Sequence, residues 1–92
     1  DDMHREVMIK LKDGNRYYAD GYLPQTKTVY EFWGDYWHGH PNKVSPDTKI
    51  GNKTAHELYI ATMIKRKKYL EHGYNLVEIW EHEWDEIKKN LN

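Results

Sequence analysis

The N-terminal third of the chain alternates between hydrophobic and polar positions with the two-residue period of a β-strand. Val7, Ile9 and Leu11 fall on one side of this alternation, which is typical of a strand with one buried face. Asp13-Gly14 follows closely and is a strong signal for a tight turn. The pattern therefore predicts a first strand that ends in a hairpin.

Two further runs continue this pattern. Residues 16–22 are rich in tyrosine, and residues 28–33 combine the β-branched and aromatic side chains that favour strands. Residues 24–27, Pro-Gln-Thr-Lys, separate the two runs as a second turn. We therefore predict a meander of three antiparallel strands.

A long segment without clear periodicity follows, and a helix comes after it. Residues 34–53 are punctuated by proline, glycine and asparagine, and a loop of this length inside a small domain is usually functional. Thr54 and Glu57 have the spacing of a helical capping box. The helix is predicted to run to about His72, because Gly73 suits the left-handed position that follows a helix end.

The last part of the chain predicts one more strand and a short helix. Residues 74–80 form a strand-like run after the helix, so we expect them to pair in parallel with an earlier strand. Residues 83–91 predict the closing helix. The element order βββαβα indicates an α/β fold. Its α+β arrangement has one mixed sheet and two helices.

The length and composition limit the class of protein. A chain of 92 residues predicts a single domain over residues 1–92. Four Trp, eight Tyr and one Phe supply the large side chains that so small a core needs. We expect Trp80 and Trp84 in this core. At least one of Tyr36 and Trp37 is expected in the core as well.

The sequence shows no membrane-spanning run, no signal peptide and no cysteine. No run approaches the roughly 20 apolar residues of a membrane span, and no signal peptide is visible, so no membrane partner is expected. Cysteine is absent, which excludes disulfides and a thiolate zinc site. A cytoplasmic location fits. Because the sequence begins with Asp1-Asp2 rather than Met, we expect a fragment of a longer protein.

The charges are unevenly distributed along a chain whose net charge is −1. Residues 42–68 contain seven Lys and Arg against two Asp and Glu, whereas the segments before and after them are acidic. Phosphate contacts are expected in this basic stretch. The alternative is that residues 65–68 are the solvated face of a helix, and the sequence leaves both interpretations open.

Two acidic residues lie on neighbouring predicted strands. Asp20 is near the end of the second strand and Glu31 is inside the third. Two carboxylates brought together in this way can bind a hard cation such as Mg²⁺. Glu31 has apolar neighbours and needs a partner, because an unpaired buried charge is costly. The alternatives are a Glu31 that points to solvent from an edge strand and a Glu31 that is paired with a lysine.

The segment directly after the Glu31 strand, residues 34–41, reads Gly-Asp-Tyr-Trp-His-Gly-His-Pro. Here the sequence resembles the very-short-patch-repair (Vsr-like) endonucleases and the EDxHD group of homing endonucleases, especially phage-type homing enzymes. The resemblance covers about Arg16 to Trp84. The stretches that carry it are Asp20-Gly21-Tyr22, residues 29–38 and residues 73–81, together with the helix between them.

This resemblance implies a PD-(D/E)XK restriction-endonuclease fold and a set of site residues. Asp20, Glu31 and the backbone carbonyl of Phe32 match the positions that hold Mg²⁺ or Mn²⁺ in the family. The lysine usually found two places after the Glu is replaced by Trp33. In the very-short-patch group a histidine supplies the missing function, and the matching residue is His38, whose imidazole can accept a proton from water at neutral pH.

Other positions depart from the family pattern. The repair enzymes carry a zinc held partly by Cys, and Asp35 stands where a Cys commonly occurs, so no zinc is expected. The acidic residue of the family's long helix aligns with Thr62. Asp47 in the long loop is the candidate replacement. Glu6 is a candidate for the family's early Glu, although a role on a strand surface is the simpler interpretation.

The leading hypothesis is a catalytic domain of a homing endonuclease that hydrolyses double-stranded DNA and relies on other domains of its parent chain for specificity. Such a protein would be intracellular and phage-encoded. The sequence does not decide whether it forms a homodimer. The second hypothesis is a catalytically silent DNA-binding domain on the same scaffold. A repair enzyme that nicks mismatched DNA alone fits less well. The residues expected to contact DNA are His40, Lys43, Lys49, Lys53, Lys65 and Arg66. Tyr36 and Trp37 either wedge against DNA bases or pack in the core.

Overall fold

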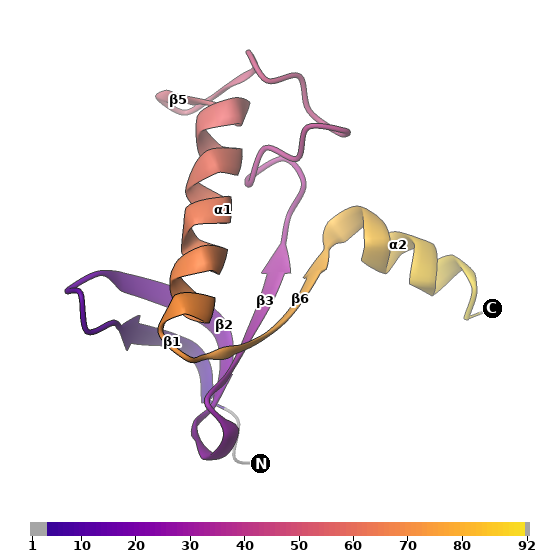
Figure 1. Cartoon of the computed structure of the whole chain (residues 1–92). Coiled ribbons are helices and arrows are strands. Elements are labelled where there is room, and N and C mark those ends of the chain that lie inside the picture. The colour runs from indigo at the N-terminus through magenta and orange to yellow at the C-terminus, as the bar shows by residue number, and fades with distance from the viewer. Residues whose placement is uncertain (1–3, 92) are drawn as a thin grey trace. The chain divides into compact units, whose positions relative to one another are not determined.

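The computed structural model describes residues 4–91 and contains a mixed four-stranded sheet, a small hairpin and two α-helices (Figure 1). The sheet order is β1-β2-β3-β6, so the strand that follows the long helix lies beside the third strand. The mixed α/β class predicted from the sequence is confirmed. The elements are β1 (His4–Lys10), β2 (Arg16–Leu23), the 3-10 turn η1 (Pro24–Thr26), β3 (Thr28–Trp33), β4 (Lys49–Ile50), β5 (Lys53–Thr54), α1 (Ala55–Glu71), β6 (Asn75–Trp80) and α2 (Glu81–Lys89).

Strands β1 and β2 form the predicted antiparallel hairpin, drawn in indigo and purple in Figure 1. Its turn is stabilised by Asp13, whose carboxylate accepts a hydrogen bond of 2.9 Å from the backbone N–H of Asn15. Gly14 adopts a φ of 92° there, a conformation that glycine reaches without steric cost. The local turn chemistry of the sequence therefore fixes where the first hairpin reverses.

Two compact units can be distinguished within the chain. The first comprises the described residues up to Glu31 together with Lys65–Glu78, and the second comprises Phe32–Ile64 and the described residues from Ile79 onward. Helix α1 and strands β3 and β6 each begin in one unit and end in the other.

The first unit contains a continuous hydrophobic core. Its buried members are Ile9, Leu11, Ala19, Val29 and Tyr69. Ile9 and Leu11 come from the alternating positions that the sequence marks as one buried face, and the helix contributes a tyrosine that is 0% exposed. Because all these residues lie within one unit, its core gives the strands of the meander a common packing partner.

The ends of α1 follow the sequence prediction closely. At the start, the backbone N–H of Thr54 donates to the carboxylate of Glu57 at 2.8 Å, and the N–H of Glu57 donates to the Thr54 hydroxyl at 3.1 Å. This is the reciprocal pattern of a capping box. At the other end, Gly73 has a φ of 81°, as expected for a residue that terminates a helix in the left-handed conformation.

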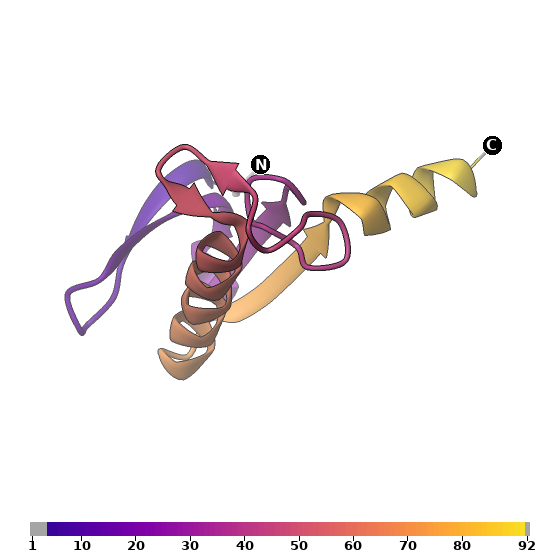
Figure 2. The same ribbon diagram turned by 90° about the horizontal axis from the view of Figure 1, so that it is seen from above.

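The second unit departs from the prediction in the segment before α1. Residues 34–53 were expected to be irregular throughout, but β4 and β5 form a short antiparallel hairpin immediately before the helix (Figure 2). Gly51 has a φ of 67° at its turn. Strands of two residues leave no periodicity in a sequence, which explains why the pattern gave no sign of them.

Helix α2 also differs from the expectation. It begins at Glu81, two residues before the predicted start, and contains no buried residue. Trp84 is 40% exposed, so its expected place in the core is wrong, whereas Trp80 is half-buried against other rings. Within residues 4–91, neither helix has the length and apolar character needed to cross a membrane.

Candidate functional site

Glu31 is the most deeply buried charged residue in the described part of the first unit, with 5% of its surface exposed. Its Oε1 atom accepts a hydrogen bond of 3.3 Å from the backbone N–H of Asp20 on the neighbouring strand. The two predicted acidic residues are therefore brought together. A Glu31 that points to solvent, one of the alternatives left open by the sequence, is excluded by this burial.

The other oxygen of Glu31 is held by two residues of α1. Oε2 lies 3.0 Å from the Lys65 ammonium and accepts a hydrogen bond of 3.0 Å from the Tyr69 hydroxyl. The Lys65 ammonium also donates to the backbone carbonyl of Tyr18 at 2.8 Å. The lysine-paired alternative for Glu31 is thus confirmed, and the partner that its burial demands is supplied by the chain itself.

Burial governs the titration of this cluster. Desolvation raises the pKa of Glu31 above its ordinary value, and the neighbouring Lys65 ammonium partly opposes that rise. The pKa of the Tyr69 hydroxyl is also raised, first by burial and then by the negative charge of Glu31. Tyr69 therefore remains a hydrogen-bond donor toward the carboxylate at any ordinary pH.

The donor chemistry of this cluster suits a hard divalent cation. Within residues 4–91, no group of three or more His, Asp or Glu side chains is placed to hold a metal ion. Mg²⁺, however, is commonly bound by one or two carboxylates, its other positions being filled by water and substrate phosphates. Asp20 and Glu31 carry this number of carboxylates, with Asp20 an exposed residue and Glu31 a buried one. Phe32, whose carbonyl is the third predicted ligand, directly follows Glu31 on β3.

In the second unit, His38 is oriented by a hydroxyl on α1. Its Nδ1 atom lies 2.9 Å from Oγ1 of Thr62, and that hydroxyl donates its own hydrogen to the carbonyl of Leu58 at 3.0 Å. A hydroxyl has a single hydrogen to donate, so Thr62 acts as acceptor toward a protonated Nδ1. The neutral imidazole therefore has its basic lone pair on Nε2.

The turn that carries His38 requires glycine at the next position. Gly39 has a φ of 62°, and a Cβ atom placed on it would lie 1.9 Å from the backbone carbonyl oxygen of Ala55. The His38 ring packs edge-on against Trp33, with ring centres 5.0 Å apart. Backbone contact and ring packing together fix the orientation of the imidazole.

A second group of polar side chains in this unit was not predicted. His82 is half-buried and has its Nδ1 2.8 Å from the carboxylate of Asp35. The ring of His40 lies 4.6 Å from that of His82 and 4.6 Å from that of Trp80. Burial and the neighbouring His82 lower the pKa of His40. Their separation in sequence gives no signal for this cluster.

The two aromatic residues just before His38 are more exposed than the sequence predicts. Trp37 is 69% exposed and Tyr36 is 46% exposed, so neither is a core residue. Their rings contact each other edge-on at 5.2 Å. The expectation that at least one of them packs in the core is wrong, and both rings are accessible to a partner.

The predicted basic residues fall into two groups. Lys43, Lys49 and Lys53 are exposed in the second unit. In the first unit, Lys65 is paired with Glu31, and Arg66 makes a two-pronged ion pair with Glu78, in which Nε and Oε1 are 2.6 Å apart. The charge of this second group is therefore already partly neutralised by carboxylates of the chain itself.

Asp47 and Glu6 are the last two candidate site residues. Asp47 is exposed in the loop before β4, whereas Thr62 is the residue that reaches His38. Glu6 is exposed on β1 and has a φ of 50°.

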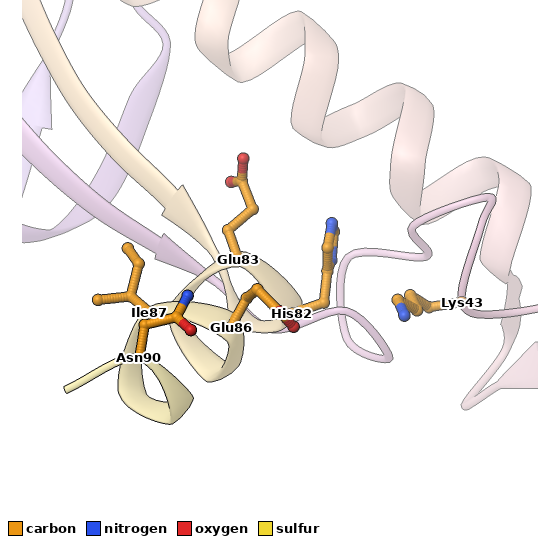
Figure 3. A pocket seen from close by; sticks show the side chains of 6 residues that line it. All are labelled: Lys43, His82, Glu83, Glu86, Ile87 and Asn90. Atoms are coloured by element: carbon orange, nitrogen blue, oxygen red, sulfur yellow. The ribbon is translucent and has the colours of Figure 1, made fainter. Parts of the chain in front are cut away.

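A pocket of about 460 Å³ lies beside α2 (Figure 3). Its lining residues are Lys43, His82, Glu83, Glu86, Ile87 and Asn90. The mixed charge of this lining favours no particular ligand.

The chain was compared with known proteins in three ways. No family model matches it, and no match was found among curated proteins or among solved structures.

Proposed function

We propose that this chain is the catalytic domain of a metal-dependent endonuclease of the homing type, which hydrolyses phosphodiester bonds of double-stranded DNA. The proposal assigns a PD-(D/E)XK-like arrangement to its mixed sheet. It rests on the resemblance of residues 16–84 to very-short-patch-repair and EDxHD homing enzymes and on the buried Glu31, which lies beside the exposed residue Asp20 on the neighbouring strand.

The observation that supports it most is the burial of Glu31 beside Asp20. A buried ion pair contributes little net stability, and its replacement by well-packed apolar side chains is often neutral or stabilising. A carboxylate that is 5% exposed in so small a core therefore calls for a role other than stability. Ionisable groups with perturbed surroundings are frequent at functional sites.

In this proposal Asp20 and Glu31 would hold a divalent cation, and the carbonyl of Phe32 would be the third ligand. A bound Mg²⁺ would polarise the scissile phosphate and stabilise charge on the leaving oxygen. His38 accepts the proton of the attacking water on Nε2, the nitrogen that the Thr62 hydroxyl leaves unprotonated. Thr62 is thereby a positioning residue in place of the expected acid Asp47.

The exposed lysines of the second unit are assigned to the DNA backbone. Lys43, Lys49 and Lys53 carry charge that can neutralise phosphates without reading the sequence. Specificity is assigned to further domains of a longer parent protein, since a tethered domain raises the effective concentration of DNA at the site. This division of labour suits a domain whose net charge is −1.

A second candidate function is favoured by one specific contact. Because Lys65 already neutralises Glu31 at 3.0 Å, the acidic pair can be a purely structural feature of a silent DNA-binding domain. On that interpretation the protein binds DNA through its exposed lysines and cleaves nothing.

Cleavage of a supercoiled plasmid separates the two functions. We expect nicked or linear product with Mg²⁺ or Mn²⁺ and none with EDTA. Glu31→Gln, Asp20→Asn and His38→Ala should each lower the rate by about 100-fold or more, the usual contribution of such groups. Glu71→Gln, an exposed change on α1, is the matched control. An intact plasmid under all conditions, despite measurable DNA binding, would favour the silent domain.

A further inference from the structure

The Lys65 ammonium occupies a position at Glu31 that a bound cation would also require. Its Nζ atom lies 3.0 Å from Oε2 of Glu31, and only 18% of the lysine side chain and 3% of the glutamate side chain are exposed. Few water molecules can therefore screen the two charges from each other. Any second cation at Glu31 would meet the positive charge of Lys65 at close range.

The surroundings of Lys65 hold the ammonium at this position. The Tyr18 carbonyl accepts its hydrogen bond at 2.8 Å. The rings of Tyr17 and Tyr69 lie beneath it, with centroids 5.9 Å and 6.0 Å from Nζ. Tyrosine rings attract cations through their negative faces, so this part of the first unit is a built cation site.

The two oxygens of Glu31 are held unequally. Oε2 carries both the ammonium and the Tyr69 hydroxyl at 3.0 Å, whereas Oε1 has the longer contact of 3.3 Å with the backbone N–H of Asp20. Oε1, which accepts from the Asp20 N–H, is therefore the less tightly held of the two oxygens. A divalent cation bound there at about 2.1 Å would repel an ammonium that remained on Oε2.

We propose that Lys65 is a resident counter-ion of the acidic pair, which a divalent cation displaces from Glu31 when it binds. The inference rests on the proposed metal-dependent function and adds a regulation of the same site. Without the cation, the ammonium stabilises the buried carboxylate. When the cation binds, it takes over that neutralisation, so the two positive groups compete and Lys65 lowers the affinity for the metal.

Calorimetric titration with MnCl₂ tests this competition. Wild type is compared with Lys65→Met and with Lys67→Met, which removes an exposed charge from the same helix. We expect Lys65→Met to bind Mn²⁺ at least about tenfold more tightly, which corresponds to about 1.4 kcal/mol, and Lys67→Met to bind as wild type does. Equal or weaker binding by Lys65→Met would overturn the proposal, as would absence of binding in both.

A further variant separates this inference from the proposed function. If Glu31→Gln abolishes Mn²⁺ binding while Lys65→Met leaves the affinity unchanged, the metal site stands and the counter-ion role fails. If Glu31→Gln binds Mn²⁺ as wild type does, the metal is not held by Glu31 and both proposals fail.

One measurement on the wild-type protein does not depend on the folding of a variant. The acetylation rate of Lys65 by acetic anhydride, read by mass spectrometry, should rise when Mn²⁺ is added, because the ammonium leaves its buried partner. The rate at Lys67 provides the internal reference. An unchanged rate at Lys65 with saturating Mn²⁺ would show that the ammonium stays in place and would overturn the proposal.

Discussion

The two units of the protein hold their central polar side chains by different physical means. In the first, the Glu31 carboxylate is buried and neutralised by the Lys65 ammonium. In the second, His38 is held by a neutral hydroxyl and by surrounding rings. The first arrangement depends on charge in a region of low effective dielectric, and the second depends on shape and hydrogen-bond direction.

This difference determines how each unit should respond to change. Removing one member of a buried ion pair leaves an uncompensated charge, which is among the most costly single changes in a protein. Removing a neutral acceptor costs less but alters which nitrogen of an imidazole carries the proton. Variants in the first unit should therefore alter stability, and variants in the second should alter reactivity.

The largest expected effect is that of Lys65→Met measured without metal. It should lower the free energy of unfolding by about 4 kcal/mol, because Glu31 is left buried and unpaired. Urea denaturation followed by circular dichroism measures the change. The double variant Glu31→Leu with Lys65→Met should recover most of the loss. A loss below about 1 kcal/mol, typical of exposed pairs, would contradict a charge-governed first unit.

Gly39→Ala should have the next largest effect and tests the importance of shape in the second unit. The added Cβ would meet the Ala55 carbonyl at 1.9 Å, and the positive φ adds strain, so we expect a loss of about 3 kcal/mol. Gly51→Ala is the matched control, because its φ of 67° is similar and nothing lies within 4 Å of the new atom. Equal losses in thermal denaturation would refute the backbone contact.

Tyr69→Phe isolates the neutral donor of the first unit. The hydroxyl donates to a buried carboxylate at 3.0 Å, and hydrogen bonds to charged groups contribute about 2 kcal/mol. Urea denaturation should show a loss of this size. Tyr17→Phe, on a half-buried ring packed edge-on against Tyr69 at 5.7 Å, should have little effect. A neutral result for Tyr69→Phe would mean that the carboxylate does not need this donor.

Thr62→Val tests hydrogen-bond direction in the second unit. Loss of the acceptor should remove the preference for a protonated Nδ1 in His38, and cleavage should slow by about tenfold, as for other residues that orient a reactive group. Ring ¹⁵N chemical shifts report the tautomer independently of activity. Thr62→Ser keeps the hydroxyl and should keep the wild-type tautomer. A wild-type tautomer in Thr62→Val would exclude the positioning role.

The smallest effect is expected for an exposed ion pair at the edge of the first unit. Lys68 lies 2.8 Å from Asp13 and holds the pKa of that carboxyl well below its usual range. A depressed carboxyl pKa stabilises the fold above the unfolded pKa of about 3.9, and this contribution is lost as the pH falls further.

Denaturation as a function of pH measures this contribution. Asp13→Asn should lose less stability than wild type below about pH 4, and the difference should shrink at high salt because exposed charges are screened. Lys67→Met, on the same helix, is expected to leave the acid limb of the stability curve unchanged. Parallel curves for wild type and Asp13→Asn would contradict the coupling.

Much of the fold could be predicted because its signals are local. Asp13-Gly14 marks the first hairpin, and Thr54 with Glu57 marks the start of α1, through contacts between residues at most three positions apart. The β4–β5 hairpin was missed because its strands of two residues contain no repeat. The exposure of Trp84 was missed because a helix pattern does not show which face finds a partner.

The candidate site could be predicted only in part. Asp20 and Glu31 lie together because a single turn joins their strands, which the sequence shows. The partner of Glu31 depends on a long-range contact with Lys65, which no local pattern shows on its own. A usable signal exists, since Lys65 and Tyr69 are four residues apart and therefore share a helix face. His82 and Asp35, in contrast, are brought together by the fold with no local signal.

Paramagnetic broadening by Mn²⁺ tests the central claim, that Asp20 and Glu31 receive a divalent cation, most directly. In ¹H–¹⁵N spectra of the labelled chain, we predict that substoichiometric MnCl₂ broadens the amide signals of Asp20, Glu31 and Phe32 first, and that Glu31→Gln abolishes this. Spectra that stay sharp at these residues, or broaden first around Asp35 and His82, would contradict the account.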